Sequence, residues 1–305
     1  MAFWRERTPS RTFGGVTRRA VETSGWRGTA SALGALLVAL AVGQRLVRAE
    51  GGPPPRNAKV APKTAAKPTA CPAEMTLVGE ACVDRYEAHL LRKKDDGTLA
   101  PHPPYLRPSP GVFVAVSEPS VRPQAYISRI EAESACENAN KRLCTVSEWS
   151  RACRGENDTT YPYGAGFVAG RCNVGKAHLL SMLHGSDPKA WLYDEHFNDP
   201  ELDQRPGFLA NTGEFAGCVS SYGVYDLVGN LHEWVADRVD ASLANKVPLT
   251  EGLRSRLRAN TGKGIFMGGF FSTTNQHGNG CNFVTMAHEP KYHDYSTGFR
   301  CCKTP

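Results

Sequence analysis

The sequence predicts an irregular α+β domain that is low in regular secondary structure and held together by disulfides. Three observations lead to this prediction. Two helix-capping motifs follow one another between Ser128 and Gly155. Beyond Gly155 the chain consists of short apolar runs separated by Gly, Asn, Asp and Pro, without a helical period or a βαβ repeat. The ten cysteines are even in number and none lies in a C-x-x-C pair, which favours disulfides over zinc or thioredoxin-like chemistry.

Residues 1–49 have the pattern of an export signal. Arginines precede an uncharged, largely apolar run, residues 29–43, and Val47-Arg48-Ala49 follows it. This run is 15 residues long, whereas a helix needs roughly 20 residues to span a bilayer. A cleaved signal is therefore favoured over a membrane anchor, which stays the alternative. Either way we expect an exported chain that is periplasmic, envelope-anchored or secreted.

The charge distribution argues against a nucleic-acid partner. Residues 1–67 carry 12 Lys and Arg against three Glu, whereas the rest of the chain carries 24 basic residues against 27 acidic ones. Nucleic-acid binding needs basic residues clustered on the folded surface. Residues 50–70 are rich in Pro, Ala and Lys and are predicted to be an extended linker. Residues 71–305 then form the globular domain.

Within the domain, three local elements can be predicted from the residues. Cys71 and Cys82 flank a short strand and turn. Ser128 begins a helix through its capping box with a glutamate three positions on. Thr145 begins a second helix in the same way, and Arg154-Gly155 ends it.

The strongest local signal for a ligand is the segment from Tyr222 to Trp234. Asp226 and Glu233 flank a Gly-Asn turn, so two carboxylates and several carbonyls can face one point, as the hard oxygen coordination of Ca²⁺ requires. The simpler interpretation is a turn with Trp234 in the core and two solvated carboxylates.

Several segments together resemble the formylglycine-generating enzymes, also called sulfatase-modifying factors. These segments occur in the order of that family from about residue 73 to the end of the chain. They are Tyr126-Ile-Ser128, Asn140 to Trp149, Ala152-Cys-Arg-Gly155, Tyr161-Pro-Tyr-Gly164, Cys172-Asn-Val174, Gly223 to Trp234, Gly268-Gly-Phe-Phe271 and Thr297-Gly-Phe-Arg-Cys301. The resemblance implies a single domain related to C-type lectins and held by calcium and disulfides.

The resemblance also implies two structural calcium sites. The second falls on Asp226 and Glu233 by side chain and on Gly229 and Leu231 by carbonyl, which matches the oxygen cage proposed from the residues alone. The first is half present. Asn173 and Val174 match, but Pro206 stands where the family has an aspartate, so either Asp203 substitutes through a shifted loop or the site is empty.

Two disulfides follow from the resemblance, and three more complete the set. The family pairs are Cys136 with Cys301 and Cys153 with Cys281. Position along the chain favours Cys71 with Cys82 and Cys172 with Cys218, which leaves Cys144 with Cys302. An exchange of partners among Cys136, Cys144, Cys301 and Cys302 stays open.

The family's catalytic copper is not expected in this chain. In these enzymes two further cysteines bind copper(I), which prefers thiolates. The matching positions here are Thr273 and Gly278, and neither can provide a thiolate.

We therefore expect a non-catalytic binding or scaffold module at the cell envelope, with an unknown protein or glycan ligand and a structural calcium ion. The alternatives are a divergent oxidoreductase that acts on protein cysteine, with Cys301-Cys302 or another metal, and a lectin-like carbohydrate binder that uses exposed aromatics such as Tyr292 and Tyr295.

Overall fold

A computed structural model describes residues 71–108, 110–274 and 278–305. The expected signal segment, its apolar run at residues 29–43 and the expected linker at 50–70 lie outside the described residues. In the described ranges, no helix has the length and apolar character needed to cross a membrane.

The first sheet joins the start of the domain to its end. It has the strand order β1-β2-β11-β6, and neighbouring strands run antiparallel. Its strands are β1 (Met75–Val78), β2 (Ala81–Asp84), β6 (Arg142–Leu143) and β11 (Cys301–Lys303). The hairpin of β1 and β2 is the strand and turn predicted between Cys71 and Cys82.

The second sheet carries the candidate site and has the order β10-β7-β8-β9. Strand β10 runs parallel to β7, and the other pairs are antiparallel. Its strands are β7 (His232–Arg238), β8 (Gly264–Met267), β9 (Val284–Thr285) and β10 (Thr297–Phe299). Arg300 is the one residue between β10 and β11, so it lies where the chain passes from the second sheet to the first.

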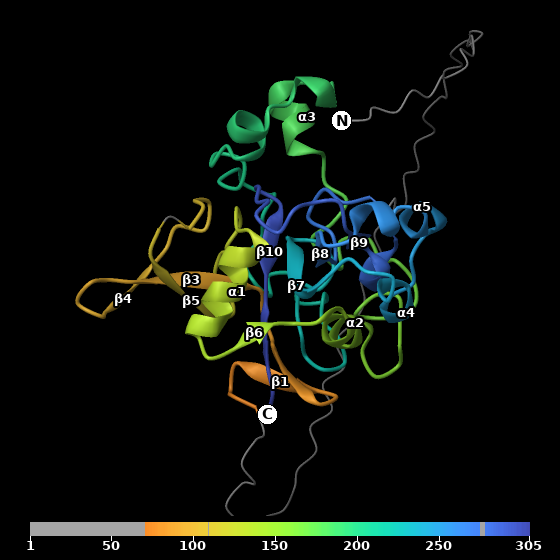
Figure 1. Cartoon of the computed structure of the whole chain (residues 1–305), viewed down its shortest axis with the longest axis horizontal. Coiled ribbons are helices and arrows are strands. Elements are labelled where there is room, and N and C mark those ends of the chain that lie inside the picture. Colours follow the sequence, from red (N-terminus) through yellow and green to blue (C-terminus); the bar gives the residue numbers. More distant parts are fainter. Residues whose placement is uncertain (1–70, 109, 275–277) are drawn as a thin grey trace, which may run out of the picture. The chain divides into compact units, whose positions relative to one another are not determined.

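The third sheet is an antiparallel layer beside α1 (Arg129–Asn138), as Figure 1 shows. It has the order β4-β3-β5. Its strands are β3 (Ala88–Lys93), β4 (Leu99–Pro101) and β5 (Val112–Ser117). Burial alternates along β5, with Phe113 and Ala115 facing the core, because successive side chains of a strand point to opposite faces.

The two capping boxes form as the sequence predicts. Ser128 accepts a hydrogen bond from the Glu131 backbone N–H while the Glu131 carboxylate accepts from Ser128, and α1 follows. Thr145 and Glu148 form the same reciprocal pair at the start of α2 (Val146–Arg154). Gly155 ends α2 with φ of 69°, a left-handed conformation that glycine adopts without strain.

The remaining helical segments are short. They are α3 (Leu179–His184), α4 (Leu243–Lys246), α5 (Glu251–Arg254), three 3₁₀ turns at Pro188–Ala190, Arg258–Asn260 and Gly280–Asn282, and a π turn at Tyr193–Phe197. Most of the described chain after α2 is therefore loop, which confirms the irregular α+β prediction.

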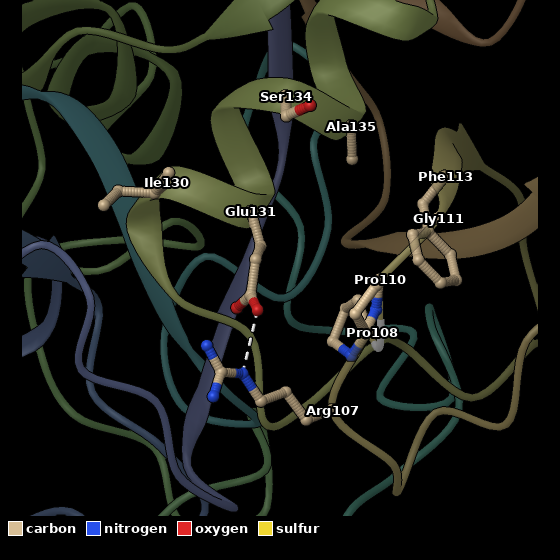
Figure 2. Close-up of a pocket in the computed structure, with 9 residues that line it drawn as sticks. All are labelled: Arg107, Pro108, Pro110, Gly111, Phe113, Ile130, Glu131, Ser134 and Ala135. Carbon is tan, nitrogen blue, oxygen red and sulfur yellow. Dashed lines mark hydrogen bonds and ion pairs between the residues drawn. The ribbon is translucent and has the colours of Figure 1, made fainter.

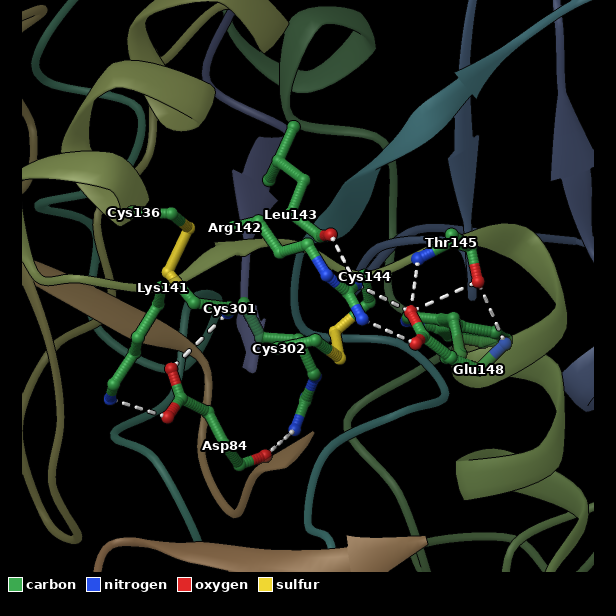
Figure 3. Close-up of a disulfide and its surroundings, with 12 residues drawn as sticks. Asp84, Cys136, Lys141, Arg142, Leu143, Cys144, Thr145, Glu148, Cys301 and Cys302 are labelled. Atoms are coloured by element: carbon green, nitrogen blue, oxygen red, sulfur yellow. Dashed lines mark hydrogen bonds and ion pairs between the residues drawn. A yellow bond between two sulfur atoms is a disulfide. The ribbon is translucent and has the colours of Figure 1, made fainter. Parts of the chain in front are cut away.

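All ten cysteines are bonded in five disulfides, and they form the same pairs that the sequence leads us to expect. The pairs are Cys71–Cys82, Cys136–Cys301, Cys144–Cys302, Cys153–Cys281 and Cys172–Cys218. Figure 3 shows how Cys301 and Cys302, adjacent on β11, reach partners on both sides of β6. The exchange of partners left open above does not occur.

Candidate functional site

The turn between Asp226 and Glu233 has an unusual backbone. Asp226, Gly229 and Asn230 have φ of 60°, 82° and 57°, values that Gly, Asn and Asp tolerate better than other residues. Asp226 and Glu233 are 3% and 1% exposed. The interpretation with two solvated carboxylates is therefore wrong, although its placement of Trp234 in the core is correct.

Arg300 forms a buried ion pair with Glu233. Its Nε donates to Glu233 Oε2 at 2.6 Å, and its Nη2 donates to Oε1 at 2.5 Å. The guanidinium is fully buried and also donates to the backbone carbonyls of Asp84 and Tyr225. Trp149 Nε1 donates to Glu233 Oε2 at 2.7 Å. The Glu233 carboxylate is therefore held by three hydrogen bonds from two side chains.

A third carboxylate, Glu87, lies in the same interior. It is fully buried, and its two oxygens accept from Asn230 Nδ2 at 2.5 Å and from the Leu231 backbone N–H at 3.2 Å. Burial raises the pKa of Glu87 well above its usual value, and the nearby Asp226 and Glu233 raise it further. Burial likewise raises the pKa of Asp226 to about 7.

The charges of this cluster do not balance. Glu87, Asp226 and Glu233 bring three negative charges near one another, and Arg300 brings one positive charge. Buried charges are costly unless they are paired. The cluster therefore requires either protons on two carboxylates or a cation with two positive charges.

The four residues expected at the second calcium site fit a divalent cation in the type of ligand atom and in charge. Carboxylate and carbonyl oxygens are the ligands that Ca²⁺ takes. A carboxylate offers about four lone-pair positions, and Glu233 uses three of them for Arg300 and Trp149. A position at Oε1 remains. Among the described residues there is no preformed group of three or more Asp, Glu, His or Cys side chains around one metal position, so backbone carbonyls would have to supply part of the shell.

Asn230 connects this turn to three other segments. Its Oδ1 accepts from Asn173 Nδ2 at 2.8 Å and from the Ala210 N–H at 3.0 Å, and its backbone oxygen accepts from the Phe271 N–H at 3.1 Å. Its Nδ2 donates to Glu87. Asn230 is fully buried and bonded on both sides of its amide, so it positions the residues on either side of it in the sequence.

The expected first calcium site lies directly beside the second. Asn230 N–H donates to Asn173 O at 2.8 Å, and a Cβ at Gly229 would lie 2.1 Å from that oxygen. Asp203, the alternative ligand for this site, lies elsewhere. Its backbone carbonyl accepts from Arg122, whereas both of its carboxyl oxygens are buried without a hydrogen-bond partner.

The positions expected for catalytic cysteines are occupied in a way that excludes thiolates. Thr273 Oγ1 accepts from the Phe270 N–H at 2.7 Å and closes a tight turn. Gly278 has φ of 113°, and a Cβ there would lie 2.3 Å from Asn282 O. No side chain fits at residue 278 with this backbone, so a cysteine would require the loop to move.

A cleft of about 450 Å³ opens next to Thr273. Aromatic and hydroxyl side chains line most of it, and six of them are Phe270, Phe283, Tyr292, Tyr295, Ser272 and Thr285. Tyr292 is half-buried and Tyr295 is only 1% exposed, so the expectation that Tyr295 is an exposed aromatic is wrong. The cleft also contains Asp294, whose oxygens already accept from Tyr292 and Ser296.

A second cavity, of about 640 Å³, lies between α1 and the segment before β5 (Figure 2). Pro108, Pro110 and Phe113 form one wall, and Glu131 on α1 pairs with Arg107 across it at 2.8 Å. The charged groups of this cavity thus satisfy one another, and nothing in it gives a chemical role.

Sequence reasoning did not identify Glu87 or Asn230 as site residues, and it placed Arg300 only within a terminal motif. The signal for Asn230 was its place in the Gly-Asn turn, since Asn tolerates a positive φ. Glu87 and Arg300 come from segments far away in the sequence, and no local pattern connects them to the turn.

Comparison of the sequence with known proteins finds relatives in the family that it resembles. The family profile described as the sulfatase-modifying factor enzyme 1-like domain matches residues 105–305, about two thirds of the chain. The inactive C-alpha-formylglycine-generating enzyme 2 of Bos taurus is 30% identical over 121 residues, which are 39% of this chain and 34% of that protein. The formylglycine-generating enzyme of Thermomonospora curvata is 26% identical over 210 residues, 66% of this chain and 62% of that enzyme.

The chain thus spans between about a third and three fifths of these two relatives. Among solved structures, the Major Tropism Determinant P3c variant aligns with a TM-score of 0.38 and 15% identity, over 76% of this chain and 52% of that one. Treponema denticola variable protein 1 aligns with a TM-score of 0.37 and 13% identity, over 77% of this chain and all of that one. On the extent of the family match, the chain belongs to the sulfatase-modifying factor enzyme 1-like domain family.

Proposed function

We propose that this protein is an exported, non-catalytic binding module that has kept the family's domain without its cysteine-oxidising site. One observation carries the proposal. At residue 278, where the resemblance expects a thiolate, the backbone leaves no room for any side chain. Thr273 at the partner position uses its hydroxyl to close a turn.

The state of the cysteines supports the same conclusion. A cysteine attacks a disulfide or binds copper(I) as its thiolate, and all ten cysteines are bonded to one another. The alternative of a thiol-modifying oxidoreductase through Cys301-Cys302 would first require reduction of two bridges whose cysteines are fully buried. The relative in Bos taurus, which is described as inactive, agrees with a non-catalytic role.

Export is supported by the same bridges. Disulfides form and persist in oxidising compartments such as the periplasm or the extracellular space. Five bridges in one domain therefore favour an exported protein at the envelope or outside the cell.

For the ligand, we propose an uncharged segment of another protein, bound in the cleft beside Thr273. Aromatic rings there offer stacking and apolar contact. Three imidazoles, of His178, His232 and His288, also line the cleft. Its one carboxylate, Asp294, is already bonded on both oxygens, so no free anionic acceptor remains there for sugar hydroxyls. The chemistry of the cleft therefore favours a peptide over a glycan.

We also propose that Asp226, Gly229, Leu231 and Glu233 hold a structural calcium ion. The two positive charges of the ion would balance the two uncompensated carboxylates beside Arg300. Its role would be to hold the turn, because Ca²⁺ brings no redox chemistry.

The test of the main proposal is a thiol and copper assay on the purified protein. Labelling of the denatured, unreduced chain should detect no free thiol, and copper(I) titration of the native chain should show no stoichiometric binding. Thr273→Cys and Ser272→Cys, each made singly, show that the label reports one added thiol when one is present. One equivalent of tightly bound copper(I), or formylglycine formed on a cysteine peptide, would refute the proposal.

The cleft is tested separately by peptide and glycan arrays. Binding of uncharged peptides that weakens with Phe283→Ala and persists with Ile130→Ala, in the other cavity, is the expected result. Binding of glycans alone would assign the cleft to carbohydrate instead.

A further inference from the structure

The segment expected to hold the first calcium ion contains a lysine bonded to its backbone carbonyls. Lys176 Nζ donates to Gly207 O at 2.5 Å and to Phe208 O at 2.8 Å. The same Phe208 oxygen accepts from Asn173 Nδ2 at 2.9 Å. The ammonium group thus shares a carbonyl with Asn173, one of the two residues that match the first site.

Among the described residues, no group of three or more Asp, Glu, His or Cys side chains surrounds a metal position here, and Glu214 is the one carboxylate whose charge acts on Lys176. Pro206 stands at the position of the missing aspartate, and the carboxyl of Asp203 bonds to nothing, while its backbone carbonyl bonds to Arg122. A calcium ion depends on anionic oxygens to repay its dehydration. Carbonyl and amide oxygens alone suit a single positive charge with N–H donors better.

The backbone holds Lys176 in the right place for this contact. Its N–H donates to Phe271 O at 2.8 Å, and its ammonium lies 5.7 Å from the ring centre of Phe215, a distance at which a cation is attracted to an aromatic face. Lys176 therefore contacts three other parts of the chain, with its backbone at residue 271 and with its side chain at residues 207–208 and 215.

We infer that the Lys176 ammonium takes the place of the first calcium ion. A side-chain cation, instead of a bound metal ion, then connects the segment at Asn173 to the segment at Phe208. The two neighbouring sites would then differ in kind. The loop around Lys176 is independent of calcium, whereas the turn around Asp226 depends on it. The inference about Lys176 does not require that the second site binds calcium.

The experiment measures calcium stoichiometry and thermal unfolding on the full chain. Lys176→Met should lower the melting temperature by several degrees, by the same amount in calcium and in chelator. Gly207 O loses the ammonium donor, and Phe208 O keeps only its bond from Asn173. Lys176→Arg should recover most of the loss, since it keeps a positive donor. Lys94→Met, at an exposed lysine, is the matched control and should change nothing.

The number of calcium ions bound by each variant distinguishes the inference about Lys176 from the proposal for the second site. Asp226→Ala should bind no calcium if Lys176 occupies the first site. One calcium ion that persists in Asp226→Ala and is lost in Asn173→Ala would overturn the inference. If the wild-type chain binds no calcium, the second-site proposal fails, while an equal loss of stability on Lys176→Met in both conditions still supports the role of Lys176.

Discussion

Two neighbouring regions of the domain pair their oxygen atoms with a side-chain cation in different ways, one fully buried and one close to the surface. At Glu233, the charges of Glu87 and Asp226 also act, and Arg300 supplies one positive charge. Beside Asn173, Lys176 donates to two backbone carbonyl oxygens, and the nearest charge acting on it is that of Glu214. The regions are joined by Asn230, which bonds to both. The number of carboxylates in each region therefore sets whether one side-chain cation is enough.

The largest effect should come from breaking the carboxylate-rich region at Arg300. Arg300→Met removes the guanidinium that pairs with Glu233 and leaves this buried carboxylate with Trp149 as a neutral donor but without its positive partner. Loss of one member of a buried pair costs about 3–5 kcal/mol. Urea unfolding should show a decrease of that size, whereas Arg258→Met, at an exposed position, should show almost none. A decrease below about 1 kcal/mol would mean that Arg300 does not balance the cluster.

Removal of calcium should affect the same region and leave the other unchanged. A bound ion at 100 times its dissociation constant stabilises the folded state by about 2.7 kcal/mol. We therefore expect chelator to lower the melting temperature of the wild-type protein, and Asp226→Ala to abolish that sensitivity.

Asp226→Asn is the matched control for Asp226→Ala, because Asn keeps an oxygen ligand and tolerates φ of 60°. It should retain part of the calcium response. If the wild-type protein melts identically with and without chelator, the calcium proposal is wrong, and protons balance the charges of the cluster instead.

How much the sequence could predict depended on the distance between interacting residues. The capping boxes at Ser128 and Thr145 formed as expected because their partners lie three positions away. The Asp226 turn was also recognisable, since its special residues are contiguous. Arg300 pairs with Glu233 at a separation of 67 residues, and Asn230 pairs with Glu87 at 143. Such pairs depend on how the sheets assemble, and no local pattern records them.

Burial was the second feature that could not be predicted from the sequence. A carboxylate beside a Gly-Asn turn looks the same in the sequence whether it is solvated or enclosed. Asp226 and Glu233 become buried because β10 runs beside β7 and brings Arg300 next to them. Lys176 likewise has no distinctive neighbours in the sequence, and only the approach of residues 207 and 208 gives its ammonium a role.

Asp203 extends the comparison to a buried carboxyl whose two oxygens have no hydrogen-bond partner among the described residues. Burial raises its pKa well above the usual value, and Asp294 adds to the rise, against the weaker effect of Arg122. The folded state holds this proton more tightly than the unfolded state does. The contribution of Asp203 to the free energy of unfolding is therefore greatest below about pH 4 and is lost as pH rises from there through the raised pKa. The slope from one such group is at most about 1.4 kcal/mol per pH unit.

Asp203→Asn should remove that slope and stabilise the protein at neutral pH. Urea unfolding at a series of pH values measures both changes. The other titratable groups near Asp203 are Asp294, Tyr126 and Tyr295, so Asp294 keeps part of the pH dependence in the variant. An unchanged pH profile in Asp203→Asn would show that this carboxyl is ionised in the folded protein.

The smallest effect should come from Glu148, which repeats the geometry of Glu233 in a more solvated place. Burial alone would raise its pKa, but Arg142, which donates at 2.6 and 2.7 Å, and the capping hydrogen bonds from Thr145 outweigh it and hold the pKa below its usual value (Figure 3). Stability from Glu148 is therefore present above pH 4–5 and is lost as pH falls through the lowered pKa. Side chains of Arg142 and Glu148 are 39% and 20% exposed, so water screens the pair.

We expect Glu148→Gln to cost about 0.5–1 kcal/mol at pH 7, because the capping bonds persist and only the charge is lost. Glu131→Gln, in the capping box of α1, is the matched variant, and its pairing with Arg107 is more exposed. Comparison of the two with Arg300→Met measures what burial adds to the same carboxylate–guanidinium contact. A loss at Glu148 as large as that at Arg300 would mean that hydrogen-bond geometry, and not enclosure beside Glu87 and Asp226, makes the buried pair strong.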